Sequence, residues 1–188
     1  FPNVTLVGVL SADSFLYGND FQCHEHAFSM LTQVVGRSGR GGRSGRAYIQ
    51  TYHPDHPVIL QAARQDYCSF YRNEILERRA LLYPPFCDLC VIGLSGLKEQ
   101  EVDQCAKSFL SLLRDTAKQL PPDLPIRLLG RGKPAVYKLH NRYRQRIVLK
   151  CKNNAPFRRY IRKLLIFASS QKAFKNVQIY GDINGEIQ

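Results

Sequence analysis

Val4-Thr5-Leu6-Val7-Gly8-Val9-Leu10 is a continuous apolar run with the length of a β-strand. A strand buried on both faces has this pattern, and such strands are typical of parallel sheets. The apolar residues of 22–36 then recur at helical spacing, and residues 46–51 have the composition of a second strand. A strand, a helix and a strand in this order predict a βαβ unit.

The second half of the chain predicts a different arrangement. A helix is expected over 58–81, and Tyr83-Pro84-Pro85 ends it because the residue before a proline disfavours helical backbone. The elements expected after it are strand 86–94, helix 99–119, strand 126–130, strand 143–151, helix 156–168 and strand 176–181. This β-α-β-β-α-β order is the split βαβ arrangement of ferredoxin-like domains. We therefore expect an α/β domain over 1–82 and an α+β domain over 83–188.

The stretch Gln33-Val34-Val35-Gly36-Arg37-Ser38-Gly39-Arg40 follows the expected helix of the first domain. Its two arginines are three residues apart, so a helix end or a tight loop can direct both at one anion. Guanidinium groups stay charged and bind phosphate oxygens in a fixed fork, and glycines let a phosphate approach the backbone. The stretch is a candidate nucleotide-phosphate contact, and its alternative is a solvated basic loop.

The spacing Gln-x-x-Gly-Arg-x-Gly-Arg resembles motif VI of superfamily 2 helicases. The flanking stretches 1–14, 50–57, 77–80 and 83–86 extend the similarity. Together they resemble the C-terminal quarter of the PriA family of primosomal replication-restart helicases, also called primosomal protein N′. The resemblance implies that residues 1–82 are part of the second RecA-like helicase lobe and its connecting helix. It implies that residues 83–188 are a C-terminal domain that binds DNA and partners.

The resemblance also assigns roles to single residues. Gln33, Gly36, Arg37 and Arg40 would bind the nucleotide, with Arg37 and Arg40 catalytic at the γ-phosphate and Arg40 as the arginine finger. Asp13 and Ser14 would end motif V, which couples the nucleotide site to DNA. A strand-to-loop turn capped by Asp13 is the alternative for that pair. Two further arginines, 43 and 46, either contact DNA or are solvated.

The function implied is that of an ATP-dependent 3′–5′ DNA helicase that recognises stalled replication forks and restarts replication by primosome assembly. Its cofactors would be ATP and Mg²⁺, with zinc bound by a region upstream of Phe1. The chain has no Gly-x-x-x-x-Gly-Lys-Ser/Thr phosphate loop, and its first residue is consistent with a boundary inside a larger protein. We therefore expect this chain alone not to hydrolyse ATP.

Basic residues give the chain a formal net charge of +12. Residues 126–175 contain fifteen Lys or Arg and no Asp or Glu, an asymmetry typical of a surface that binds a polyanion. The predicted DNA contacts within this segment are Arg131, Lys133, Tyr137, Lys138, Arg142 and Arg144. Tyr137 and Tyr143 could stack on unpaired bases. The alternative is that Tyr143 belongs to the core and that some of the charges only solvate the domain.

Arg158 and Arg162 lie four residues apart, on one face of the expected helix 156–168. Beside Ile161, Leu164 and Leu165 they could bind an acidic and hydrophobic peptide. The resemblance implies the tail of single-stranded-DNA-binding protein as that peptide, and a solvated helix face is the alternative. The other implied partners are forked and single-stranded DNA and primosome proteins, with no membrane and a cytoplasmic, nucleoid-associated location.

The cysteines of the chain are the first candidates for a metal site. The chain has six cysteines, and Cys87-x-x-Cys90 is a single pair within an expected strand, where its members face opposite sides. A structural zinc site commonly needs four ligands, so we expect no metal site in this chain. The alternative to a helicase is a non-catalytic nucleic-acid-binding or adaptor module with a ribosomal-protein-like fold.

Overall fold

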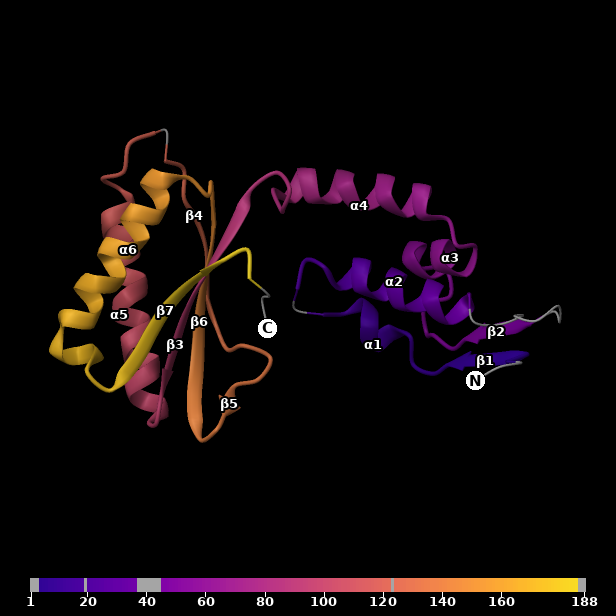
Figure 1. The fold of residues 1–188 in the computed structure, drawn as a ribbon, viewed down its shortest axis with the longest axis horizontal. Helices are drawn as coiled ribbons and strands as arrows, with labels where there is room; N and C mark the ends of the chain where they lie inside the picture. Colours follow the sequence, from indigo (N-terminus) through magenta and orange to yellow (C-terminus); the bar gives the residue numbers. More distant parts are fainter. Residues whose placement is uncertain (1–3, 19, 37–44, 123, 186–188) are drawn as a thin grey trace. The chain divides into compact units, whose positions relative to one another are not determined.

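The computed structural model describes residues 4–18, 20–36, 45–122 and 124–185. The chain divides into two compact units, residues 1–81 and residues 82–188. Figure 1 shows the elements of each unit. Among the described residues, no helix combines the length and the apolar character needed to cross a membrane.

The first unit contains the predicted βαβ arrangement. Strands β1 (Leu6–Val9) and β2 (Arg46–Ile49) pair in parallel, and helices α1 (Asp13–Leu16) and α2 (Cys23–Val35) lie between them in the sequence. Helix α2 buries Ala27, Phe28 and Leu31, which recur at helical spacing. The expectation that residues 4–10 are buried on both faces is wrong for β1, whose residues alternate and whose Leu6 is 62% exposed.

The helix expected over 58–81 is two helices, α3 (Pro57–Ala63) and α4 (Tyr67–Leu81). Gln65 between them has a φ of 54°, which ends a right-handed helix. The Asp66 carboxylate accepts a hydrogen bond of 3.0 Å from the Ser69 backbone N–H and so caps the start of α4. A periodic apolar pattern continues across such a break, so the pattern alone predicts one helix.

The second unit has the predicted β-α-β-β-α-β order. Its elements are β3 (Asp88–Gly96), α5 (Glu99–Ala117), β4 (Arg127–Gly132), β6 (Arg142–Cys151), α6 (Ala155–Ser170) and β7 (Val177–Ile183). A two-residue strand, β5 (Lys138–Leu139), and a 3₁₀ turn, η1 (Lys172–Phe174), are additional. The sheet is antiparallel throughout with the order β4-β6-β3-β7, and β5 pairs with β6.

Helices α5 and α6 pack on one face of this sheet (Figure 1). Alternate residues of the central strands point into that core, including Ile92 of β3 and Ile147 of β6. Phe109 of α5 and Phe157 of α6 are fully buried against them. The intervening residues of each strand point to the other face of the sheet, which the helices leave uncovered. Some of them line the hollow described below.

Candidate nucleic-acid interface

The basic hairpin, residues 131–146, carries all six predicted DNA contacts. Strand β5 pairs with the start of β6, and the turn between them is His140–Asn141. Both turn residues have positive φ, 47° and 59°, which is the pattern of a type I′ hairpin turn. Asn and His adopt this conformation more readily than most residues. The sequence therefore forms a tight hairpin where a longer basic loop was expected.

A β-bulge precedes the hairpin. The pairing of β4 with β6 shifts register between Leu128 and Gly130, and Gly130 has a φ of 133° that favours glycine. A bulge bends its strand and re-aims the side chains that follow it. Arg131 is the first residue after this bend, and it faces helix α5.

Acidic residues of α5 hold part of the basic hairpin. The Arg131 guanidinium pairs with the Asp103 carboxylate, and the Lys133 Nζ lies 3.7 Å from Glu99 Oε1. The Tyr137 hydroxyl donates to Glu99, and this hydrogen bond raises the pKa of Tyr137 to about 12. Ion pairs near the surface contribute about 0–1 kcal/mol each. The Lys133–Glu99 pair is therefore the weaker of the two, because its side chains are at least half exposed, whereas those of Arg131 and Asp103 are 27% and 32% exposed.

The two tyrosines expected to stack on bases contact each other. The rings of Tyr137 and Tyr143 meet edge to face, with centroids 5.7 Å apart. The Lys133 ammonium lies 3.9 Å from the Tyr137 ring centroid, and the Lys138 ammonium lies 4.7 Å from that of Tyr143. These cation–π contacts order the hairpin. They also cover part of the ring surface that a base would need.

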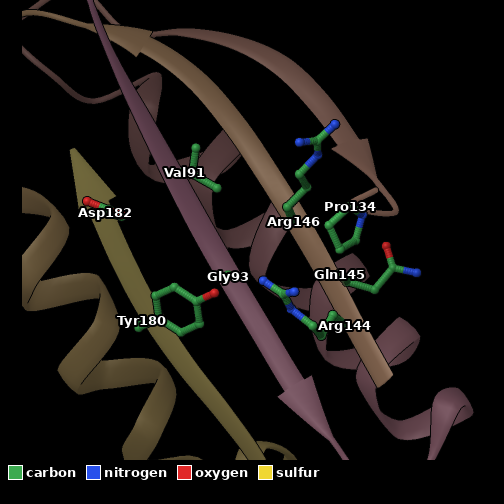
Figure 2. A pocket seen from close by; sticks show the side chains of 8 residues that line it. All are labelled: Val91, Gly93, Pro134, Arg144, Gln145, Arg146, Tyr180 and Asp182. Atoms are coloured by element: carbon green, nitrogen blue, oxygen red, sulfur yellow. The ribbon is translucent and has the colours of Figure 1, made fainter. Parts of the chain in front are cut away.

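Arg142 and Arg144 are held by backbone carbonyl groups. Arg142 donates from Nη2 to the Ser95 carbonyl at 2.9 Å and from Nε to the Ser95 hydroxyl at 3.3 Å. Arg144 donates to the Val136 carbonyl at 3.4 Å. Arg142 thus braces the hairpin against β3, whereas Arg144 points over the sheet face that the helices leave uncovered (Figure 2).

A hollow of about 370 Å³ lies on that uncovered face (Figure 2). The residues that line it are Val91, Gly93, Pro134, Arg144, Gln145, Arg146, Tyr180 and Asp182. Arg144 is the one predicted DNA contact among them. The sequence indicates Arg146 by its place opposite the apolar residues of β6, but it gives no signal for Tyr180, because that position depends on how β7 pairs with β3.

Helix α6 presents the two arginines expected to bind a peptide tail. Arg158 and Arg162 are exposed, and Arg158 donates to the Asn153 side-chain oxygen at 2.8 Å. The three apolar residues predicted to lie beside them on this surface are not exposed there. Ile161 and Leu164 are buried in the core and Leu165 is half-buried, because α6 packs that side on the sheet. Ile166, four residues after Arg162 on α6, is 61% exposed, so the apolar surface beside the arginines comes from Ile166 rather than from the expected residues.

The motif-VI-like stretch starts at the end of α2. The Gln33 side chain donates to the Ser29 hydroxyl at 3.3 Å, and Gly36 is the helix C-cap, with its N–H donating to the Thr32 carbonyl at 2.9 Å. The predicted catalytic Arg37 and Arg40 lie outside the described residues. They would follow directly from this helix end.

Asp13 connects the segments that follow the two parallel strands. Its carboxylate accepts hydrogen bonds from the Thr51 hydroxyl at 2.8 Å and from the Tyr52 backbone N–H at 3.1 Å. Desolvation opposes ionisation, but these hydrogen bonds hold the pKa of Asp13 below its ordinary value. The N-cap of α1 is Ala12 and no side chain caps this helix, so Asp13 joins the two segments rather than capping the turn.

Among the described residues, the cysteine thiols join no cluster of three possible metal ligands. Cys90 is buried, and burial raises the pKa of its thiol to about 12, whereas Cys87 donates its S–H to the Leu82 carbonyl. A side-chain cluster the sequence did not indicate contains His24, Glu74 and Glu77, whose ligand atoms lie within 4.8 Å of one another. The Glu74 carboxylate is already paired with Arg78 at 2.7 Å. Arg78 also pairs with Glu25 at 2.7 Å, so the Glu74 carboxylate of this cluster is already engaged with a cation.

A family model described as the primosomal protein N C-terminal domain matches residues 79–184, more than half of the chain. The chain belongs to the PriA family. Replication restart protein PriA of Bacillus subtilis is 36% identical over 184 residues, which are 98% of this chain and 22% of that protein. The Synechocystis PriA is 37% identical over 147 residues, 78% of this chain and 17% of that protein. The Chlamydia muridarum PriA is 51% identical over 89 residues, 47% of this chain and 12% of that protein.

The part of the chain that matches the PriA family includes the candidate interface. The family model covers the whole sheet of the second unit and both of its helices. The alignment with the Bacillus subtilis protein extends over nearly all of the first unit as well. The chain spans about a fifth of the length of the curated PriA relatives it matches.

Asp103 provides a test of how α5 holds the basic hairpin. Hydrogen bonds from Lys107 and then from Arg131 hold the pKa of the Asp103 carboxyl below its ordinary value of 3.8. Because the folded pKa is lowered, these pairs stabilise the fold above the unfolded pKa, and the stabilisation is lost as the pH falls through the folded pKa. We expect Arg131→Gln to raise the Asp103 pKa toward 3.8 in a carboxyl NMR titration. Lys118→Gln, whose lysine pairs with Asp115 at 3.7 Å, is the matched control. An unchanged Asp103 pKa in Arg131→Gln would show that the hairpin is not held there.

Proposed function

We propose that this chain is the C-terminal part of an ATP-dependent 3′–5′ DNA helicase that restarts replication at stalled forks. Membership of the PriA family carries the proposal, because the curated relatives are named replication restart proteins and align over both units. On this proposal, residues 1–82 contribute one wall of the motor and residues 83–188 bind DNA. The whole protein would use ATP and Mg²⁺, with zinc in a region upstream of Phe1.

The motor half of the proposal has local structural support. A parallel strand pair with α2 packed on it is the kind of unit from which a RecA-like lobe is built, and α2 ends at Val35, with its C-cap Gly36 directly before Arg37. Asp13 ties together the segments that follow β1 and β2. Closure of two lobes on a nucleotide would bring Arg37 and Arg40 to the γ-phosphate, and Asp13 and Ser14 would couple this movement to DNA.

The DNA-binding half rests on charge. Lysines and arginines that neutralise phosphates release counterions, and this release drives binding that weakens as salt increases. The basic hairpin offers such groups on a braced scaffold, and a phosphate would compete with Asp103 and Glu99 for them. Forked and single-stranded DNA are the proposed ligands. Other primosome proteins are the proposed partners of the whole protein, in the cytoplasm at the nucleoid.

The arginine finger is tested in the longer protein that contains the phosphate loop. We expect Arg40→Ala to reduce DNA-stimulated ATP hydrolysis about a hundredfold or more while DNA binding is kept, because the arginine stabilises charge on the transferred phosphoryl group. Arg72→Ala at an exposed position of α4 is the control, with a much smaller expected effect. Unchanged hydrolysis in Arg40→Ala, or no hydrolysis by the parent protein, would favour the alternative, a non-catalytic nucleic-acid-binding module.

The basic hairpin is tested with this chain and a labelled 20-nucleotide single strand. Changing Arg131, Lys133 and Lys138 to Gln should weaken binding and reduce the slope of log K against log salt by about two, because each phosphate contact on a single strand contributes about 0.7. The matched control changes Arg114 of α5, Lys118 at its C-cap and the exposed Lys172 to Gln and removes the same charge. Equal slopes for the two triple variants would contradict a specific role of the hairpin.

The proposed site for the tail of single-stranded-DNA-binding protein is the α6 surface with Arg158 and Arg162. Their exposure supports it, and the exposed Ile166, four residues after Arg162, offers an apolar contact for the peptide. We expect Arg158→Glu with Arg162→Glu to abolish binding of an acidic tail peptide in a titration, and Lys172→Glu with Lys175→Glu to leave it within about twofold. Tail binding that survives the first pair would end this assignment.

A further inference from the structure

The uncovered face of the second sheet is built around a glycine in its central strand. Ile92 and Leu94 of β3 point into the core, so Val91, Gly93 and Ser95 point to the opposite face. Gly93 pairs with Arg146 of β6 on one side and with Tyr180 of β7 on the other. Tyr180, Gly93 and Arg146 therefore form one row across three strands.

The ring of Tyr180 occupies the space above Gly93. A Cβ atom on Gly93 would lie 2.2 Å from Cζ, 2.5 Å from the hydroxyl oxygen and 2.6 Å from Cε1 of Tyr180. Such distances exclude a side chain at position 93 while the ring stays in place. Figure 2, which looks onto this face, shows the ring directed from β7 toward Gly93. The absence of a side chain at position 93 thus leaves the space in which the Tyr180 ring lies against the sheet.

Tyr180 remains accessible in this position. The residue is 42% exposed although its ring contacts the backbone of β3. An aromatic ring held in one orientation has little conformational entropy left to lose when a ligand stacks on it. Tyr137 and Tyr143 are less suited, because each ring contacts the other and a lysine.

Positive charge lies beside the ring in the same hollow. Arg144 and Arg146 of β6 line it, and β6 is separated from β7 by β3 alone. Two strand spacings are about 10 Å, a distance that a nucleotide and an arginine side chain together can span. Asp182 also lines the hollow, but its carboxylate is directed at Gly185, where a Cβ would lie 2.0 Å from Oδ2.

We propose that Tyr180, seated on Gly93, is a stacking site for an unpaired base of single-stranded DNA, with Arg144 and Arg146 placed for the adjoining phosphates. Bases on aromatic side chains and phosphates on arginines are the general mode of single-strand binding, and a four-stranded sheet with surface aromatics is one of its common platforms. The inference rests on the proposed DNA-binding function and locates a base contact on the sheet, apart from the basic hairpin turn.

The test compares two labelled probes, a 20-mer of thymidine and an abasic strand of the same length, at one salt concentration. Tyr180→Leu in this chain should weaken binding of the thymidine strand about 5- to 150-fold and leave binding of the abasic strand unchanged. Tyr180→Phe, which keeps the ring, should bind within about twofold of the unchanged chain. Phe167→Leu removes an exposed aromatic from α6 and is the matched control, with no expected effect.

Two outcomes would overturn the proposal while DNA binding stands. They are full binding of the thymidine strand by Tyr180→Leu and equal weakening on both probes. No binding of either probe by the unchanged chain would overturn the DNA-binding function as well. Should Tyr180→Leu fail to fold, the unchanged chain can be photocross-linked to a strand containing 5-iodouracil. A cross-link at Tyr180 would support the proposal, and cross-links confined to other residues would contradict it.

Discussion

The pairing of β3 with β6 on one side and β7 on the other is the constraint on which the second unit depends. All nine residues of β3 pair with β6, and seven of them pair with β7. A slip by one residue would turn Ile92 and Leu94 out of the core and bring Gly93 into it. The core and the proposed DNA surface are therefore opposite faces of one strand, and the register that secures the first also positions the second.

Much of the fold could be predicted from periodicity and from the prolines. The β-α-β-β-α-β order of the second unit is confirmed, and it could be predicted because each element has its own apolar period. The parallel pairing of the first unit is also confirmed, and the apolar run at 4–10 indicated it. The break between α3 and α4 was missed because it depends on the backbone conformation of Gln65, which no apolar period records. Burial of β1 on both faces was wrong, since Leu6 is largely exposed.

The charge pattern of the sequence predicted the basic hairpin, and the structure added the acidic partners and the tyrosine that the pattern could not show. The lack of acidic residues over 126–175 located the basic hairpin, but the acids of α5 that pair with it lie far away in sequence. Tyr180 could not be found from its own neighbourhood, because its partner Gly93 is 87 positions away and only the sheet register joins them. Arg37 and Arg40, the predicted catalytic pair, lie outside the described residues and stay predictions.

On the proposed function, one DNA strand contacts both the basic hairpin and the uncovered face of the second sheet. The most direct measurement is amide NMR of the isotope-labelled chain during titration with a single-stranded 20-mer. Shift changes are expected in residues 131–146 and around Gly93 and Tyr180, with helices α5 and α6 little affected on their outer faces. Changes confined to the outer face of α6 or to residues 4–81 would contradict the account.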